Sequence, residues 1–513
     1  MSQAFYLTTT LPYVNADPHI GFALEIVQAD VIARYHQLMG DLVFFNTGTD
    51  EHGQKIYQKA LEENKDPQIY CDEYAAKFDK LKSALNLSYN AFIRTTDQNH
   101  IKATQHFWTL CQQNDDIYKK IYKVKYCIGC ELEKTDSELV NGHCPLHPNK
   151  ELELREEENY FFKFSKYQSY LLDLYKNNLE FVIPSWRLTE IRSFVKNGLQ
   201  DFSISRLKAK MPWGIPVPND PNHVMYVWFD ALINYISTLG WPQNKERFTK
   251  FWGTKGNPNA LQVAGKDNLR QQSAMWQAML ASAGLPSTRQ ILIHGFITSG
   301  GQKMSKSLGN VVDPFAMVEK YGSDAVRYYL LKEINPFEDG DFTEKRFIEI
   351  YNSDLANGLG NLVQRGLTLA SKFCNGKIPA INQEKQVNIS KQDVVYWKKY
   401  DKKLRSYQFH EALMIVQEYI TKVDKFINDQ KPWEIANKPE KQKGLEEVIY
   451  ELLEHIHQIT WMIYPFLPTT AIEIAKRLNI NSLLVEKPLI KDSWHPLPFH
   501  NKVVVNNPLF PRI

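Results

Sequence analysis

The chain has 513 residues, of which 43% are hydrophobic and 23% are charged, and its formal net charge is +3. This length is too great for one hydrophobic core, so we expect a folded protein of about three domains. No apolar run approaches the ~18 residues of a membrane span and the opening residues do not resemble a signal peptide, so we expect a cytoplasmic protein with no membrane partner.

The first elements of the chain alternate between strand and helix. Residues 4–13 are apolar and β-branched, which predicts a buried strand. Apolar residues between Ile20 and Leu38 then recur at helical spacing, and residues 41–53 predict a second strand that ends in a polar turn. This order is a βαβ unit, which is typical of a nucleotide-binding parallel sheet.

The start of the predicted helix, DPHIGF, has the features of an anion site. Asp17 is a suitable N-cap and Pro18 a suitable first helical residue, so His19 and free backbone N–H groups should lie at the positive end of the helix. An anion such as phosphate binds there. Phe22 lies one turn further along the same face and donates no hydrogen bond.

Strand-like sequences return late in the chain, at 223–233, 260–268 and 289–300. We therefore expect one sheet that is split by an insertion. From about residue 345 amphipathic helical patterns replace strands, as in 409–430 and 446–467. The predicted domains are a nucleotide-binding domain at 1–114 and 223–344, an insertion at 115–222 and a helical domain at 345–513.

The predicted insertion contains a cluster with metal-ligand spacing. Cys127 and Cys130 are separated by two residues, as are Cys144 and His147, and thirteen residues lie between the pairs. Two such knuckles can supply four tetrahedral ligands to Zn²⁺. Because all four positions are then filled, we predict one structural zinc ion per chain; the alternative is four unrelated residues.

A basic loop, GQKMSKSLGN, follows the last predicted strand. It places Lys303 and Lys306 after the flexible pair Gly300 and Gly301. Two ammonium groups on such a loop can neutralise a polyphosphate while charge develops during group transfer. Alone, the same sequence also fits a solvated surface loop.

The PHIG helix start, the KMSKS loop and the split sheet together resemble class I aminoacyl-tRNA synthetases. Further stretches resemble the methionyl-tRNA synthetase family: TLPYVNADPHIG, GTDEHGQKI, VWFDALINY, PSWRLTEIRSFVKNGLQDFSISR, PWGIPVP and KPWEIA. The resemblance extends from about residue 4 to about residue 470. The insertion of about 100 residues leaves no room for the editing domain of the leucyl, isoleucyl and valyl enzymes.

This resemblance implies an α/β fold and a two-step reaction. The fold is a Rossmann-like parallel sheet split by a zinc-binding connective insertion, followed by an α-helical bundle that binds the anticodon. The substrates are L-methionine, ATP with Mg²⁺, and tRNA(Met). Methionine attacks ATP to give methionyl-adenylate and diphosphate, and the terminal ribose of the tRNA then takes the methionyl group and releases AMP. Positioning and charge stabilisation suffice for this chemistry.

The resemblance also assigns roles to individual residues. The catalytic residues would be His19, Lys303 and Lys306. ATP would further contact Gly21, Phe22, Gly265 and Asp267, the last at the ribose. Asp50 would pair with the methionine ammonium, in a pocket that also includes Leu11, Tyr13, Trp228, Ala231, Tyr235 and Gln272. The anticodon would be read by Asn361, Arg365 and Trp433. For the pocket aromatics and for Trp433 the alternative is simple packing.

Three positions depart from the family pattern. Phe22 replaces the second histidine of the helix start, Gln272 stands where a histidine usually contacts methionine, and Phe202 replaces a tryptophan. We expect Gln272 to supply a hydrogen bond in place of that histidine. The departures leave two alternatives open, namely a catalytically silent tRNA-binding relative and a class I synthetase for another amino acid. No oligonucleotide-binding domain follows residue 513, so we expect a monomer.

Overall fold

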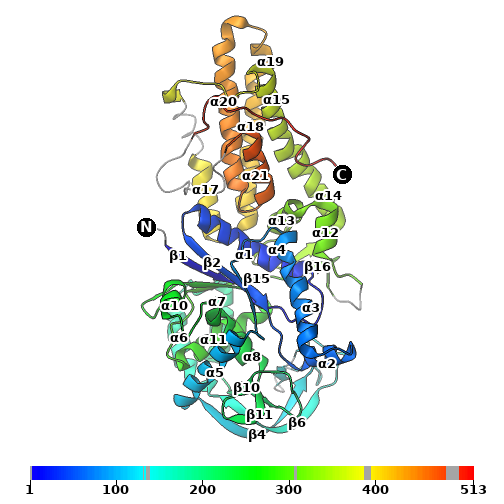
Figure 1. The fold of residues 1–513 in the computed structure, drawn as a ribbon, viewed down its shortest axis with the longest axis vertical. Helices are drawn as coiled ribbons and strands as arrows, with labels where there is room; N and C mark the ends of the chain where they lie inside the picture. Colours follow the sequence, from blue (N-terminus) through cyan, green and yellow to red (C-terminus); the bar gives the residue numbers. More distant parts are fainter. Residues whose placement is uncertain (1–2, 131, 135–138, 305–308, 386–393, 481–495) are drawn as a thin grey trace.

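The computed structural model describes an elongated molecule in which an α/β part and a helical bundle meet at helix α1 (Ile20–Leu38) (Figure 1). The described residues are 3–130, 132–134, 139–304, 309–385, 394–480 and 496–513. Among them, no helix combines the length and the hydropathy needed to cross a membrane.

Six parallel strands form the central sheet, in the order β3-β2-β1-β14-β15-β7. Strand β1 pairs with β2 on one side and with β14 on the other, which makes distant parts of the chain neighbours. The carboxyl ends of parallel strands meet at one edge, where α/β proteins place their ligands. The strands are β1 (Ala4–Thr8), β2 (Leu42–Thr49), β3 (Ala91–Arg94), β7 (Val182–Ile183), β14 (Ala260–Gly265) and β15 (Gln290–His294).

Both faces of this sheet are buried, in two separate cores. Phe5 and Leu7 of β1 pack in the core that includes α1 and the helical bundle, whereas Tyr6 packs in the core on the side of the insertion. Successive side chains of a strand point to opposite faces. A strand covered on both faces is apolar throughout, which explains the continuous apolar run at the start of the chain.

Helix α1 covers the predicted residues, but the prediction that Asp17 caps it is wrong. His19 is the N-cap, and its Nδ1 accepts a hydrogen bond from the Gly21 N–H at 3.0 Å. The Asp17 carboxylate instead pairs with Lys77 Nζ at 2.7 Å. Asp17 lies two residues before the N-cap, because α1 begins only at Ile20, and its carboxylate contacts Lys77 on α3 (Pro67–Asp79).

The insertion forms its own sheet and also completes the central one. Its strands run antiparallel in the order β5-β4-β6-β8. Ile183 of β7 pairs with Leu292 of β15, so part of the stretch 115–222 belongs to the central sheet. A two-residue strand is too short to have any periodicity. These elements are β4 (Ile117–Cys127), β5 (Leu132–Lys134), β6 (Glu153–Phe162), β8 (Phe202–Ser203), α6 (Gln168–Asn177) and α7 (Ser185–Lys196).

The prediction that residues 223–233 form a strand of the central sheet is wrong. Strand β11 (Asp220–Met225) pairs with β9 (Ser205–Leu207) and β10 (Pro216–Val217) in a small antiparallel sheet. The next residues form helix α8 (Val227–Ala231). A short apolar run fits a buried strand and a buried helical turn equally well, so its periodicity could not decide between them.

The loop predicted to close over phosphate follows a third small sheet, of order β17-β16-β18. Lys303 ends β17, while Lys306 lies outside the described residues. The sheet consists of β16 (Ile297–Ser299), β17 (Gln302–Lys303) and β18 (Gly340–Phe342). Other helices of the α/β part are α2 (Gln54–Glu62), α4 (Leu81–Ala84), α5 (Gln98–Gln113), α9 (Asn234–Ser237), α10 (Lys245–Phe251), α11 (Trp276–Ser282), α12 (Pro314–Tyr321), α13 (Ser323–Lys332) and α14 (Glu344–Ile350).

The helical domain agrees with its predicted pattern. The helix predicted at 409–430 is confirmed as α18 (Phe409–Gln430), and the one predicted at 446–467 is α20 (Gln442–Ile463). A ten-residue π-helix, Tyr351–Gly360, leads into the domain. Other helices in the described part of this domain include α15 (Asn361–Phe373), α17 (Val394–Arg405), α19 (Pro432–Ile435) and α21 (Pro468–Arg477).

A buried arginine joins the two parts of the molecule. The Arg327 guanidinium is fully buried and lies 2.8 Å from the Asp30 carboxylate of α1. It also donates to the carbonyls of Leu85 at 3.0 Å, Pro465 at 2.9 Å and Phe466 at 2.8 Å. One planar group therefore satisfies four acceptors from the α/β part and from the turn after α20.

We predict that Arg327→Met destabilises the chain by on the order of 3 kcal/mol, because it leaves buried acceptors without donors and Asp30 with one cation fewer. The measurement is the urea midpoint of unfolding. Lys320→Met, which removes an exposed pair with Glu344, serves as the control and should change the midpoint little. Equal midpoints for the two variants would contradict the prediction.

Candidate functional site

A cavity of about 450 Å³ opens where the carboxyl ends of β1, β2 and β14 meet. Nine of the residues assigned to the site from the sequence line it: Leu11, Tyr13, Asp50, Trp228, Ala231, Tyr235, Asp267, Gln272 and Lys303. They come from segments up to almost 300 residues apart in the sequence, which the parallel pairing of the strands brings together. Four others, His19, Gly21, Phe22 and Gly265, are not among the lining residues.

Asp50 is fixed in the cavity wall by its own backbone. Its N–H donates to the Pro12 carbonyl at 2.9 Å, and its carbonyl accepts from the Val14 N–H at 3.3 Å. The residue is 4% exposed. A carboxylate in a partly dry wall attracts a cation far more strongly than it would in water, so this position suits a ligand ammonium group.

The two residues after Asp50 are held by separate buried ion pairs. Glu51 accepts from Arg94 Nε at 2.6 Å, and His52 Nδ1 lies 2.6 Å from the carboxylate of Asp230 in α8. His100 Nε2 contacts the other Asp230 oxygen at 2.8 Å. Burial alone would raise the pKa of Asp230, but the two imidazoles hold that pKa below its ordinary value. The His52–Asp230 pair ties the turn after β2 to the helix that carries Trp228 and Ala231, and the Glu51–Arg94 pair ties it to β3.

Gln272 makes hydrogen bonds at the apolar end of the cavity. Its Nε2 donates to the Tyr235 hydroxyl at 2.6 Å, and its Oε1 accepts from Gln262 Nε2 at 3.2 Å. Gln272 and Tyr235 are both 2% exposed. Two buried polar groups with defined partners beside apolar walls are suited to orienting a mostly apolar ligand.

The carboxylate of Glu25, which the sequence analysis did not identify, connects the loop after β1 to the end of β15. Glu25 of α1 accepts from the Thr10 N–H at 2.8 Å and from its hydroxyl at 2.6 Å. Its other oxygen lies 2.8 Å from His294 Nε2 at the end of β15. Glu25 is a charged residue between the apolar positions of the predicted helix, so the helical pattern predicts that it faces solvent and does not indicate this role.

The predicted phosphate site has a narrow, glycine-dependent geometry. A Cβ on Gly21 would lie 2.8 Å from the His19 ring, and a Cβ on Gly265 would lie 2.7 Å from Asp267 Oδ1. Glycine at both positions therefore lets these side chains fold back close to the backbone. The Phe22 ring points elsewhere and packs edge-to-face on Phe78, with ring centroids 5.4 Å apart.

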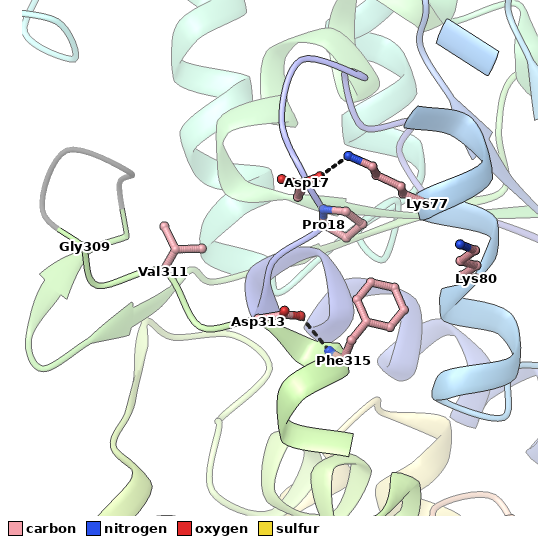
Figure 2. Close-up of a pocket in the computed structure, with 8 residues that line it drawn as sticks. All are labelled: Asp17, Pro18, Lys77, Lys80, Gly309, Val311, Asp313 and Phe315. Carbon is pink, nitrogen blue, oxygen red and sulfur yellow. Dashed lines mark hydrogen bonds and ion pairs between the residues drawn. The ribbon is translucent and has the colours of Figure 1, made fainter. Parts of the chain in front are cut away.

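A second cavity, of about 660 Å³, lies on the outer side of the same helix start (Figure 2). The Asp17–Lys77 pair and the chain after the KMSKS loop line it, including Gly309, Val311 and Asp313. The Ile20 N–H also donates to the Val312 carbonyl at 3.0 Å. The start of α1 and the end of the basic loop are therefore hydrogen-bonded to each other.

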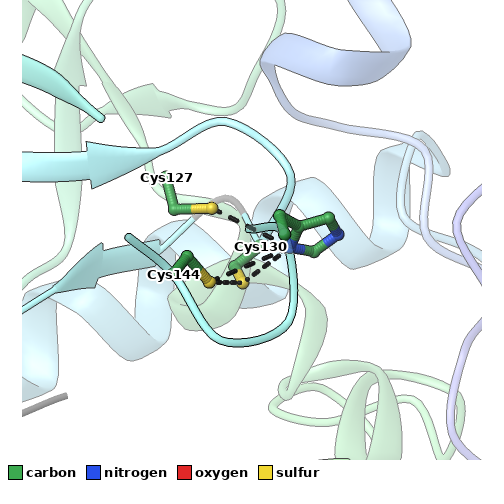
Figure 3. A group of neighbouring side chains, drawn as sticks. Cys127, Cys130 and Cys144 are labelled. Atoms are coloured by element: carbon green, nitrogen blue, oxygen red, sulfur yellow. Dashed lines mark hydrogen bonds between the residues drawn. The ribbon is translucent and has the colours of Figure 1, made fainter. Parts of the chain in front are cut away.

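The cysteine and histidine knuckles converge in the structure (Figure 3). Ligand atoms of Cys127, Cys130, Cys144 and His147 all lie within 4.8 Å of one another. Cys130 Sγ is 3.3 Å from Cys144 Sγ and 3.2 Å from His147 Nδ1. Three thiols and one imidazole make up a four-ligand set of the kind that holds structural zinc. Cys130 and His147 also line the 450 Å³ cavity, which their spacing could not indicate.

The three residues assigned to the anticodon lie in the helical domain. Asn361 and Arg365 are one turn apart on α15, and Arg365 donates to Asp424 at 2.8 Å and to Asn428 at 2.9 Å on α18. Trp433 follows the end of α18 and is 42% exposed. An exposed indole can stack on an unpaired base.

Comparisons with known proteins agree with this architecture. The family described as "tRNA synthetases class I (M)" matches residues 5–152 and 136–367, and the "Anticodon-binding domain of tRNA ligase" matches residues 395–505. Methionine--tRNA ligase of Thermotoga maritima is 42% identical over 99% of this chain and 80% of its own length. That of Nostoc sp. is 42% identical over 100% and 97%. The structure of Mycobacterium tuberculosis methionyl-tRNA synthetase in complex with methionyl-adenylate superposes with a TM-score of 0.92 at 33% identity, over 99% of this chain and 100% of that one.

The Glu25–His294 pair predicts a pH-dependent stability. Burial lowers the pKa of His294, but the hydrogen bond and charge of Glu25 raise it above its ordinary value overall. A raised pKa means that this contribution is fully present below about pH 6.5 and is lost as pH rises through the folded-state pKa. His294→Asn should therefore lower the melting temperature more at about pH 6 than at about pH 9. A deficit that does not change with pH would contradict the prediction.

Proposed function

The chain belongs to the methionyl-tRNA synthetases of class I, and on this premise we propose how its residues carry out the reaction of that family. The enzyme activates L-methionine with ATP and attaches it to tRNA(Met), releasing diphosphate and then AMP. The observation that carries the proposal is that one cavity contains Asp50, Tyr235 and Gln272 together with Asp267 and Lys303. An amino acid and a nucleotide can therefore meet in it.

Asp50 binds the ammonium of methionine at the wall of the cavity. The side chain then extends toward Trp228, Ala231 and Tyr235, where the aromatic rings offer favourable contacts to a thioether. Leu11 and Tyr13 complete this end of the cavity. Held in this way, the methionine carboxylate faces the nucleotide end, and its attack on the α-phosphorus breaks the bond to diphosphate.

At the nucleotide end, Asp267 binds the ribose hydroxyls and the start of α1 faces the phosphates. His19, together with the backbone at Gly21, lies at the positive end of the helix, and Gly265 keeps the backbone close to the nucleotide. Lys303, at the end of β17, contributes positive charge at the phosphates. Lys306, which lies outside the described residues, acts together with it. Mg²⁺ bound with ATP supplies further positive charge when diphosphate leaves.

Recognition of the tRNA rests on the helical domain. Asn361, Arg365 and Trp433 contact the anticodon bases, and Arg365 then exchanges its contacts with Asp424 and Asn428 for base edges. Zinc on the knuckles stabilises the insertion beside the cavity. We place this enzyme in the cytoplasm as a monomer, with residues 1–114 and 223–344, 115–222 and 345–513 as its catalytic, connective and anticodon-binding parts.

Exchange of labelled diphosphate into ATP tests this function directly. We expect exchange with methionine and not with the other standard amino acids. Binding of tRNA without any exchange would favour a catalytically silent relative, and exchange with a different amino acid would favour another class I specificity.

Two variants in the same assay test the helix start. His19→Ala should lower kcat at least about tenfold, because it removes a hydrogen bond to a charged group that forms in the transition state. Phe22→His should keep or raise kcat, because the Phe22 ring packs on Phe78 and donates no hydrogen bond, so the change removes no donor and adds one. A wild-type protein that is inactive until Phe22→His is made would instead identify the site as a remnant.

Metal analysis tests the zinc site. We expect about one equivalent of zinc per chain, and chelation should lower the melting temperature because zinc binding contributes to the folding free energy of the insertion. Cys144→Ser should lose the zinc, whereas Cys374→Ser, outside the cluster, should retain it. Protein purified without chelators that carries clearly less than one equivalent would contradict the prediction.

A further inference from the structure

A chain of hydrogen bonds between buried side chains ends at the methionine end of the cavity. It runs from Gln277 through Thr288, Gln262 and Gln272 to Tyr235. All five residues are at most 2% exposed. Because buried polar groups need hydrogen-bond partners, the donor or acceptor role of each one is set by its neighbour in this series of hydrogen bonds.

The direction of the chain is fixed at its far end by a backbone group. The Thr288 N–H donates to Gln277 Oε1 at 3.1 Å, and a backbone N–H can only donate. The amino group of Gln277 must then point the other way. It donates to the Thr288 hydroxyl at 3.0 Å and to the Gln272 carbonyl at 2.9 Å, which uses both of its protons.

Each following link inherits this direction. The Thr288 hydroxyl accepts from Gln277 and therefore gives its own proton to Gln262 Oε1, at 2.6 Å. The Gln262 amino group then faces Gln272 Oε1 at 3.2 Å, which turns the Gln272 amino group toward the Tyr235 hydroxyl at 2.6 Å. A reversal of any link would place two donors or two acceptors face to face.

The direction of this series determines whether the Tyr235 hydroxyl donates or accepts at the cavity. Its oxygen accepts the proton of Gln272, so its own proton points to another acceptor. Burial raises the pKa of Tyr235, while the amides of Gln272 and Asn234 oppose this rise as donors to an oxygen do. Tyr235 lines the cavity, so an acceptor on the ligand is within its reach.

We propose that Gln277, Thr288 and Gln262 are positioning residues for amino-acid specificity, which hold Tyr235 as a hydrogen-bond donor to the thioether sulfur of the substrate. This inference rests on the proposed function. The sulfur of methionine is a weak acceptor, whereas the corresponding methylene group of norleucine accepts nothing. A substrate side chain of nearly the same size without an acceptor is therefore disfavoured. Gln262, Thr288 and Gln277 do not line the cavity, so they act on the substrate only through Gln272 and Tyr235.

The test compares methionine with norleucine in ATP–diphosphate exchange for the wild type and Thr288→Val. Valine keeps the shape of threonine and the backbone N–H but removes the hydroxyl link. We expect the preference for methionine to fall about three- to tenfold, the range for one ordinary hydrogen bond, through a higher methionine KM. The KM values for ATP and norleucine and the kcat values should change less than twofold. Thr288→Ser, which keeps the hydroxyl, should retain the wild-type preference.

Tyr235→Phe provides the second arm, because it removes the donor itself. Adding Thr288→Val to Tyr235→Phe should cause no further loss of preference if the link acts only through that hydroxyl. Gln262→Met breaks the same chain elsewhere and should match Thr288→Val, so the test survives if one variant does not fold. A wild type without methionine exchange would overturn the proposed function. A wild type with exchange and an unchanged preference in Thr288→Val and Gln262→Met would overturn this inference alone.

Discussion

The functional architecture depends on the parallel pairing of β1 with β14. Tyr6 is in register with Ala260, so the loop after β1 and the residues after Gly265 must emerge at the same edge of the sheet. β2 pairs on the other side of β1 and brings the turn at Asp50 to that edge. Without this register the amino-acid and nucleotide ends of the cavity would not face each other. The connective insertion is tolerated because it leaves this pairing intact.

Buried polar groups then convert a shared edge into a shaped site. Glu25 ties the loop after β1 to the end of β15, and Asp230 ties the turn after β2 to α8. In a dry interior such groups are costly unless every partner is present, so they hold their geometry tightly. In the series of hydrogen bonds that ends at Tyr235, buried partners fix the direction of each hydrogen bond as well as the position of each side chain.

Helix α1 links this site to the helical domain. Its N-terminus carries His19, while Asp30 further along the same helix contacts Arg327, which donates to the turn after α20. A rigid helix with partners at both ends fixes the catalytic part relative to the part that carries Trp433. Precise placement over this span suits an enzyme that must hold two ends of one tRNA.

Features that depend on local spacing could be predicted from the amino-acid sequence. The bounds of α1 and α18, the two metal-ligand pairs and the motifs at Asp50 and Lys303 follow from periodicity or from fixed intervals along the chain. The sequence also indicated nine of the twenty residues that line the cavity, because the family resemblance assigned them. These signals are short-range, so they can be found before any contact between distant segments is known.

Features that depend on partners far away in the sequence could be found only in the folded structure. Asp17 pairs with Lys77 and does not cap α1, β7 belongs to the central sheet, and Cys130 and His147 line the cavity. The direction of the hydrogen bonds that end at Tyr235 is set at Thr288, in the loop before β15. Charge pairing, the pairing of a strand with a sheet and the direction of a hydrogen bond depend on the groups that folding brings into contact. Local periodicity in the sequence does not predict those contacts.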